Sequence, residues 1–270
     1  MKKKDNLFKD GNFNDLPFSF NEEVTEVFED MIDRSVPGYE SSLRLIKDLS
    51  EHYFQSDTNC YDLGCSLGAS SLSLLEGIGK RKGQVIAIDN SSAMISESKI
   101  RFSNFIKTGK IKFLEQDINN AQINTASIIV INFVLQFLET EKREILLTKI
   151  FQGMKEGGIL ILSEKIHFDN NLRNQKIYRM YDRFKLKNGY SEMEISAKRD
   201  SLEGVLVTDL EFFHVQRLNR IGFKNIRKDM SNLNFITLEA ERYCQKFQKN
   251  GLRSLISTIK IFLKVGKTRE

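Results

Sequence analysis

A short glycine-containing segment between an apolar strand and a helix is the first place where this sequence could do chemistry. Residues 62–68 read DLGCSLG and follow the apolar residues of a short predicted strand. Gly64 and Gly68 let the backbone approach a ligand closely, and the helix that begins after Gly68 leaves N–H groups free to bind it. Because the same pattern is typical of any tight strand-to-helix turn, it does not identify a ligand by itself.

An acidic residue at the end of the next predicted strand narrows the choice of ligand. Asp89 lies 21 residues beyond Gly68 and directly follows the apolar run QVIAI. A carboxylate at this place can accept hydrogen bonds from both hydroxyls of a ribose, whereas capping of the following helix is the alternative. Together with the glycine turn, Asp89 predicts a nucleoside-type ligand in the crevice at the strand ends.

The spacing of the glycines distinguishes between nucleotide ligands. A dinucleotide site needs G-x-G-x-x-G, whereas Gly64 and Gly68 are separated by three residues. The arrangement follows the E/D-x-G-x-G-x-G style of S-adenosylmethionine enzymes, with Ser66 in place of the middle glycine. Asp117 ends a third strand and fits a contact to the adenine amino group. Asn132 ends a fourth strand, near the place expected for the sulfonium arm.

Strands and helices alternate along the part of the chain that carries these residues. This alternation predicts βαβ units and a mostly parallel sheet. The strands are expected at 59–63, 84–88, 111–114, 127–133 and 157–163. Beyond them we expect a polar helical segment at 168–206, a helix at 207–221, and closing strands at 225–230 and 234–238.

This pattern predicts three regions in the chain. Residues 1–55 are expected to form an N-terminal arm and two helices, at 21–34 and 40–53, the first capped by Asn21. Residues 56–239 are expected to form the α/β domain, with 168–206 inserted as a lid over the crevice. Residues 240–270 form a separate tail.

Composition and charge indicate an ordinary globular protein. Hydrophobic residues make up 40% of the 270 residues and charged residues 29%. The longest apolar run, 128–138, is too short to cross a bilayer, and no signal-peptide core follows the basic N-terminus, so a cytoplasmic protein is expected. The cysteines, Cys60, Cys65 and Cys244, and the scattered histidines match neither a disulfide framework nor a metal site, so we expect no metal.

The tail carries the excess positive charge. The whole chain has a net charge of +5, and residues 241–270 contain eight Lys or Arg and two Glu. Leu252, Ile256, Ile259 and Leu263 share one helical face, with basic residues adjoining it. A basic amphipathic helix can bind a membrane surface, a partner protein or nucleic acid, whereas docking on its own domain is the alternative.

Segments outside the glycine turn make a specific family resemblance. The strand order and acidic strand tips are similar to those of class I methyltransferases, and the chain more closely resembles the carboxy-S-adenosylmethionine synthase family. The resemblance runs from about residue 20 to 239. The matching segments are 28–32, 34–39, 61–68, 86–90, 132–133, 135–138, 162–165, 188–192 and 198–199.

The resemblance implies a doubly wound, Rossmann-like α/β sheet with a helical N-terminal extension and a helical lid. It implies that S-adenosylmethionine and prephenate become carboxy-S-adenosylmethionine and phenylpyruvate. Carbon dioxide lost from prephenate is captured by the cofactor's methyl carbon, which acts as a sulfonium ylide in a desolvated site. The product would serve a tRNA carboxymethyltransferase that modifies wobble uridine, so this protein need not touch nucleic acid itself. A homodimer is also implied.

The resemblance also implies roles for individual residues. Arg199, assisted by Tyr39, is expected to bind the new carboxylate, since a guanidinium matches both carboxylate oxygens. Without the family resemblance, Arg199 would be interpreted as a solvent-exposed charge on a helix, and Tyr39 as a turn residue that packs its ring. The expected cofactor contacts are Tyr39, Gly64, Cys65, Ser66, Asp89, Asn90, Asp117, Ile118, Asn132 and Arg199.

Two other functions remain open at this point. The first is an ordinary methyltransferase of a small molecule or RNA, because a fold does not determine a reaction. No N/D-P-P-F/Y amine-methylation motif follows the fourth strand, where residues 132–135 read NFVL, and this disfavours one such class. The second is a non-catalytic cofactor-binding subunit of a tRNA-modifying complex, which the presence of all the expected site positions disfavours.

Overall fold

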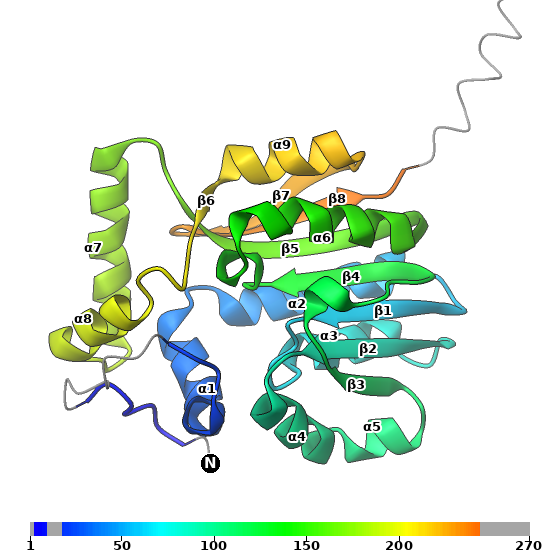
Figure 1. Cartoon of the computed structure of the whole chain (residues 1–270), viewed down its shortest axis with the longest axis horizontal. Helices are drawn as coiled ribbons and strands as arrows, with labels where there is room; N and C mark the ends of the chain where they lie inside the picture. The colour runs from blue at the N-terminus through cyan, green and yellow to red at the C-terminus, as the bar shows by residue number, and fades with distance from the viewer. Residues whose placement is uncertain (1–2, 10–17, 244–270) are drawn as a thin grey trace, which may run out of the picture.

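Five parallel strands form the centre of the molecule (Figure 1). A computed structural model describes residues 3–9 and 18–243. Within that part of the chain the sheet runs in the order β3-β2-β1-β4-β5-β8-β7, with β6 paired to β5. The strands are β1 (Thr58–Leu63), β2 (Gly83–Asp89), β3 (Ile111–Glu115), β4 (Ala126–Asn132), β5 (Met154–His167), β6 (Asp209–Leu210), β7 (Lys224–Asn232) and β8 (Phe235–Glu241).

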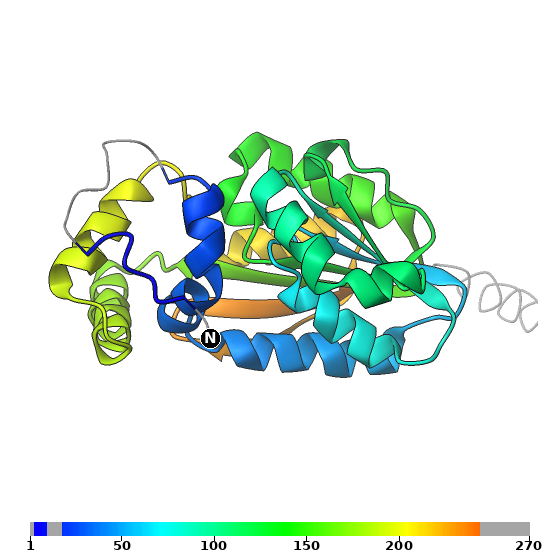
Figure 2. The ribbon, with the colours of Figure 1, turned by 90° about the horizontal axis from the view of Figure 1, so that it is seen from below.

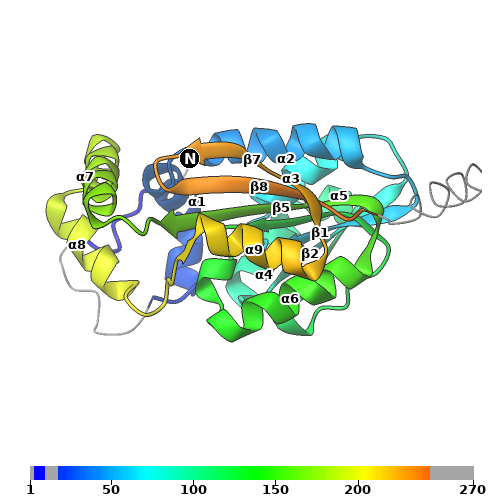
Figure 3. The ribbon, with the colours of Figure 1, turned by 90° about the horizontal axis from the view of Figure 1, so that it is seen from above.

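Helices cover both faces of this sheet, and two further helices, α7 and α8, lie at one end of it. Figure 3 shows α2 on one side of β5 and β8, and α6 with α9 on the other. Figure 2 shows α1 beside α7 and α8 at one end of the sheet. The helices are α1 (Glu22–Ser35), α2 (Tyr39–Tyr53), α3 (Ala69–Ile78), α4 (Ser92–Arg101), α5 (Ser103–Lys107), α6 (Thr140–Gly153), α7 (Asn171–Lys187), α8 (Glu192–Ser201) and α9 (Glu211–Ile221).

The core consists of one apolar layer on each face of the sheet. One layer joins β1, β4 and β5 to Leu146, Leu147 and Ile150 of α6 and to Leu218 of α9. The other joins the same strands to residues of α2, α3 and α4. β4 is buried along nearly its whole length, as expected for a central parallel strand with helices on both faces. The predicted doubly wound α/β fold is therefore confirmed.

The strand order reverses between β1 and β4. From β1 the chain moves outward through β2 to β3, then returns to add β4 and β5 on the other side. The crevice at the carboxyl ends of the strands beside such a reversal is where open α/β sheets bind ligands. The Gly64 turn follows β1, and Asn132 ends β4, so both lie at this reversal.

Several element boundaries differ from the sequence-based predictions; β5, expected at 157–163, runs from Met154 to His167. The predicted helix at 207–221 begins only at Glu211, because Asp209 and Leu210 pair with β5 as β6. Asp209 is held there by ion pairs with Arg143 and Arg217, each 3.0 Å long. β8 extends to Glu241 and pairs with β5 and β7, so the sheet includes the first two residues of the expected tail.

Four other expectations concern the cap of α1, the segment 168–206, membrane-spanning helices and the tail. Asn21 caps α1 as predicted, its side chain accepting a hydrogen bond from the Val24 N–H at 3.0 Å. The segment 168–206 contains α7 and α8, which are joined through Gly189. In the described part of the chain, no helix has both the length and the apolar character needed to span a membrane. The predicted amphipathic helix near 252–263 lies outside the described residues.

Candidate functional site

A cavity of about 390 Å³ opens at the carboxyl ends of the parallel strands. Its volume lies within the range of small-molecule sites. Polar groups at the ends of β1, β2, β3 and β4 form one part of the wall, and apolar and aromatic side chains form most of the rest. Nine of the ten expected cofactor contacts line it, namely Tyr39, Gly64, Cys65, Ser66, Asp89, Asn90, Asp117, Ile118 and Asn132.

The turn after β1 takes a shape that requires glycine. Gly64 has a φ of 77°, and a Cβ added there would lie 2.5 Å from Val134 Cγ2. The N–H groups of Gly64 and Cys65 both donate to the carbonyl of Ile88, at 2.8 and 3.0 Å. These bonds hold the turn against the end of β2, and the bare backbone of Gly64 lines the cavity.

Asp89 is held at the end of β2 with both oxygens oriented. Its Oδ2 accepts the Ser66 N–H at 2.8 Å, and its Oδ1 accepts the Ser91 N–H at 2.9 Å. Burial raises the pKa of this carboxyl, while the backbone N–H donors oppose the rise. Helix α4 is capped by Ser91, whose side chain accepts the Met94 N–H. Capping of α4 therefore does not explain the position of Asp89.

A second carboxyl lies beneath this wall. Asp62, the acidic residue before the glycine turn, is buried and accepts a hydrogen bond of 2.6 Å from the Ser71 hydroxyl. Burial raises its pKa to about 7, and the nearby Asp89 adds to the rise. Asp62 does not line the cavity; its hydrogen bond to Ser71 ties the end of β1 to α3.

The ends of β3 and β4 contribute polar groups of two kinds. Asp117 binds the N–H of Asn119 through Oδ1 at 2.8 Å, and this bond shapes the turn after β3. Asn132 donates through Nδ2 to the Ser70 hydroxyl at 3.1 Å. The Oδ1 of Asn132 is buried and has no hydrogen-bond partner among the described residues. Buried amide oxygens usually have a hydrogen-bond partner, and Asn132 is one of the residues that line the cavity, so a ligand donor is a candidate partner for this oxygen.

The two residues expected to bind a carboxylate lie in different surroundings. Tyr39 begins α2, lines the cavity, and is half-buried, with its ring 6.4 Å from that of Phe133. Burial raises the pKa of its hydroxyl, which therefore stays protonated and can donate. Arg199 does not line the cavity in this chain: its side chain is 60% exposed and its Nη2 lies 2.8 Å from Asp182 Oδ2. Its role toward the cofactor stays a prediction.

Sequence reasoning missed several residues of the cavity wall. Lys165, Lys198, Tyr181 and Phe235 line it, although none was assigned a role. Lys165 follows the apolar run of β5 just as Asn132 ends that of β4, and the two strands pair in parallel. The sequence could therefore have predicted that Lys165 lies near Asn132 at the carboxyl edge of the sheet. The α7 and β8 residues carried no comparable signal.

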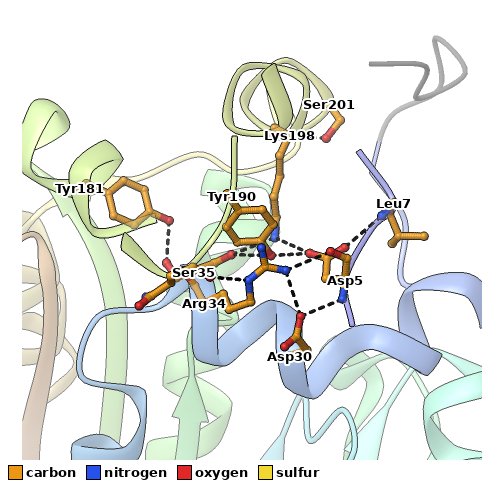
Figure 4. Close-up of polar contacts among 10 residues, drawn as sticks. Asp5, Leu7, Asp30, Arg34, Ser35, Tyr181, Tyr190, Lys198 and Ser201 are labelled. Carbon is orange, nitrogen blue, oxygen red and sulfur yellow. Dashed lines mark hydrogen bonds and ion pairs between the residues drawn. The ribbon is translucent and has the colours of Figure 1, made fainter. Parts of the chain in front are cut away.

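A buried polar cluster joins the segment 168–206 to the N-terminal region (Figure 4). Tyr190 donates its hydroxyl hydrogen to Asp5, and the guanidinium of Arg34 lies 3.7 Å above the Tyr190 ring. Lys198 donates to the Ser35 hydroxyl at 3.0 Å and lies 3.8 Å from Asp5 Oδ2. Residues 3–9, α1 and α8 thus meet in one cluster, which sets the position of α8 over the cavity.

The cavity wall is made of groups that suit a nucleoside with a cationic arm. Asp89 and Asp117 offer carboxylate oxygens, Gly64 offers a backbone surface, and Asn132 offers an unpaired acceptor. Across the described ranges, no group of three or more His, Cys, Asp or Glu is placed to hold a metal ion. Cys60 and Cys65 are buried free thiols.

Comparison with known proteins relates the chain to one family. A model described as a methyltransferase domain matches residues 61–158. The carboxy-S-adenosyl-L-methionine synthase of Colwellia psychrerythraea is 43% identical over 223 residues, which cover 83% of this chain and 91% of that protein. The synthase of the same name from Erwinia tasmaniensis is 42% identical, covering 89% of this chain and 98% of that protein.

Solved structures share the fold at low sequence identity. A putative S-adenosylmethionine-dependent methyltransferase from Methanococcus maripaludis superposes with a TM-score of 0.55 at 17% identity, covering 87% of this chain and 99% of that one. A magnesium protoporphyrin IX methyltransferase from Synechocystis, solved with bound S-adenosylhomocysteine, superposes with a TM-score of 0.53 at 15% identity, covering 80% and 93%. These likenesses concern the fold alone.

Proposed function

The chain belongs to the carboxy-S-adenosyl-L-methionine synthase family of S-adenosylmethionine-dependent enzymes, and from that premise we propose that it converts S-adenosylmethionine and prephenate into carboxy-S-adenosylmethionine and phenylpyruvate. In this reaction prephenate loses its ring carboxylate as CO₂. A methyl C–H bond of the cofactor is replaced by a C–C bond to that CO₂. The released proton and the ring hydroxyl of prephenate leave together as water, so the atoms balance.

The observation that supports this proposal is the contrast between the two ends of the cavity. The wall at β1–β4 carries carboxylates and an amide oxygen, which suit a ribose, an adenine and a cationic sulfonium. The wall beyond β4 carries Lys165 and Lys198, which suit an anion. Burial lowers the pKa of each lysine to about 8. A neutral methyl acceptor needs no such cations, whereas a dianionic donor of CO₂ gains from charge complementarity with them.

The cavity walls also give the reaction a sheltered environment. Most of the lining between Phe18, Phe28, Val205 and Phe235 is apolar. Excluding water protects released CO₂ from hydration and strengthens every charge interaction inside the site. Tyr39 keeps its proton and can donate a hydrogen bond toward a carboxylate formed on the methyl carbon.

We further propose that the protein acts as a homodimer and that its product is consumed by a tRNA carboxymethyltransferase. Arg199 of α8 does not line the cavity of its own chain and is paired only with Asp182 among the described residues. A second copy is the simplest source of a surface for it to contact. No nucleic-acid contact is required of this chain, because the cofactor itself carries the carboxyl group.

The test is turnover with prephenate labelled by ¹³C in its ring carboxylate. We expect the purified protein to yield a cofactor heavier than S-adenosylmethionine by one labelled CO₂, together with unlabelled phenylpyruvate, detected by mass spectrometry. Unlabelled bicarbonate in excess should not dilute the label, because the site is sheltered. A methylated product without carboxylation would support the ordinary methyltransferase instead. Cofactor binding without turnover would support a non-catalytic subunit.

A further inference from the structure

The cavity continues past the expected cofactor contacts, over strands to which no function is assigned. The expected contacts lie at the ends of four neighbouring strands, in the spatial order β3, β2, β1 and β4. They are Asp117 after β3, Asp89 at the end of β2, Gly64 after β1 and Asn132 at the end of β4. β5 and β8 come next, and Lys165 pairs with Phe235 across them. Both residues line the cavity. A cofactor spread across β3 to β4 would therefore leave this end of the cavity for a second molecule.

Lys165 differs from the other lysines near this end because its charge has no anionic partner within the described ranges. Its Nζ lies 4.7 Å from the centroid of the Tyr181 ring and 5.8 Å from that of Phe235. By contrast, Lys185 lies 3.0 Å from Asp182, and Lys198 is bonded to the Ser35 hydroxyl. Among the residues that the structure describes, no carboxylate forms an ion pair with Lys165.

The surroundings of Lys165 favour binding of an anion. Burial, together with the positive charges of Lys185 and Arg199, lowers the pKa of its amine to about 8, against a smaller opposite effect of Asp182. A partly buried ammonium without a counterion is costly, and a bound carboxylate would remove that cost. The site is therefore built to gain a negative charge from outside the chain.

The aromatic neighbours of Lys165 indicate what carries this negative charge. The rings of Tyr181 and Phe235 have centroids 5.4 Å apart, and Phe133 lies 5.8 Å from Phe235. Burial raises the pKa of the Tyr181 hydroxyl, which donates to the Ser35 carbonyl at 2.8 Å and so fixes the ring (Figure 4). A ring-bearing carboxylic acid fits a wall of fixed aromatic rings beside one ammonium.

We propose that Lys165 binds a carboxylate of the second substrate, a ring-bearing carboxylic acid whose ring packs against Tyr181 and Phe235. This inference rests on the proposed function and specifies which carboxylate is held. An ammonium paired with the carboxylate that leaves as CO₂ would stabilise the ground state and slow the reaction. Lys165 therefore holds the side-chain carboxylate of prephenate, which is retained in phenylpyruvate, and the ring carboxylate is left free to depart.

The test compares Lys165→Met with Lys165→Arg. Methionine keeps the length and apolar contacts of lysine but removes its charge, so the aromatic wall should remain in place. We expect Lys165→Met to raise the KM for prephenate, and the Kd of phenylpyruvate for the S-adenosylhomocysteine-loaded protein, by at least about 30-fold. The arginine variant should recover part of this loss. Affinity for S-adenosylhomocysteine should change by less than about threefold in both variants, which also shows that they fold.

Lys47→Met is the matched control, since Lys47 of α2 pairs with Glu76 of α3 at 2.9 Å and does not line the cavity. It should leave the KM and both Kd values unchanged. Equal binding of phenylpyruvate by wild type and Lys165→Met would overturn the inference. So would a loss confined to carboxy-S-adenosylmethionine, because Lys165 would then serve the new carboxylate of the cofactor.

A separate measurement distinguishes failure of the inference from failure of the proposed function. If the wild type does not consume prephenate, the proposed function fails, and benzoate compared with benzamide still tests Lys165. The wild type should prefer the charged ligand by about tenfold or more, and Lys165→Met should lose that preference. Absence of any preference in the wild type would overturn the assignment of Lys165 to a carboxylate.

Discussion

Replacement of Arg199 by alanine is expected to change the affinity of the protein for the two forms of the cofactor by different amounts. In this chain the Arg199–Asp182 pair is largely exposed, at 60% and 33% for the two side chains. Exposed pairs contribute about 0–1 kcal/mol, so the free energy of unfolding should fall by less than about 1 kcal/mol. A charge-assisted pair with a ligand carboxylate in a partly desolvated site is worth roughly 2–5 kcal/mol. Arg199→Ala should therefore raise the Kd of carboxy-S-adenosylmethionine by about one to three decades.

S-adenosylmethionine should behave differently, because its methyl arm is cationic and gains nothing from a nearby guanidinium. Its Kd should be unchanged or slightly lower in Arg199→Ala. Arg199→Lys should restore only part of the affinity for the carboxylated ligand, since a point charge cannot match both oxygens. Arg179→Ala, on the exposed side of α7, is the control and should affect neither ligand.

The assay is calorimetric titration of both ligands into the wild type and the three variants, with thermal melts for stability. Equal losses for both ligands would mean that Arg199 is structural. No loss for either would place it outside the site and favour the ordinary methyltransferase. If protein concentration governs the affinity for the carboxylated ligand, Arg199 acts across a dimer.

Three further predictions concern the cofactor, the pH dependence of stability and the tail. Asp89→Asn should raise the Kd of S-adenosylhomocysteine, measured by calorimetry, by about two decades or more. The reason is that hydrogen bonds to a charged acceptor are worth about 1.5–3 kcal/mol each. Unchanged affinity would refute ribose binding by Asp89. Since burial raises the pKa of Asp62 to about 7, the folded state holds a proton that the unfolded state has lost, and stability should fall as pH rises from about 4 to 7. Glu164, whose pKa burial raises to about 8, adds to the same slope, so Asp62→Asn should make it shallower in thermal melts between pH 4 and 8. A slope equal to that of the wild type would contradict this pKa. A chain stopped after Tyr243 should fold and turn over prephenate, because β8 ends at Glu241; precipitation would show that residues 244–270 cover apolar surface.

The positions at the strand ends could be predicted because they depend on local patterns. Apolar runs marked β1, β2 and β4, and Gly64, Asp89 and Asn132 follow or end those runs. Parallel strands bring their carboxyl ends to one edge of a sheet, so residues far apart in sequence had to meet there. The boundary of the helix expected at 207–221 was wrong, because the ion pairs of Asp209 with Arg143 and Arg217 hold residues 209–210 in the sheet.

The sequence by itself therefore determined the α/β fold, the reversal beside β1 and the family, since each is carried by hydrophobic periodicity, by turn residues and by short motifs. Only the tertiary structure decided the far end of the cavity. Tyr181 comes from helix α7 and Phe235 from the returning strand β8, and both meet Lys165 through packing. The position of α8 likewise depends on Asp5 and Tyr190, which bond across 185 residues. Such contacts follow from how whole elements pack, and no local pattern records them.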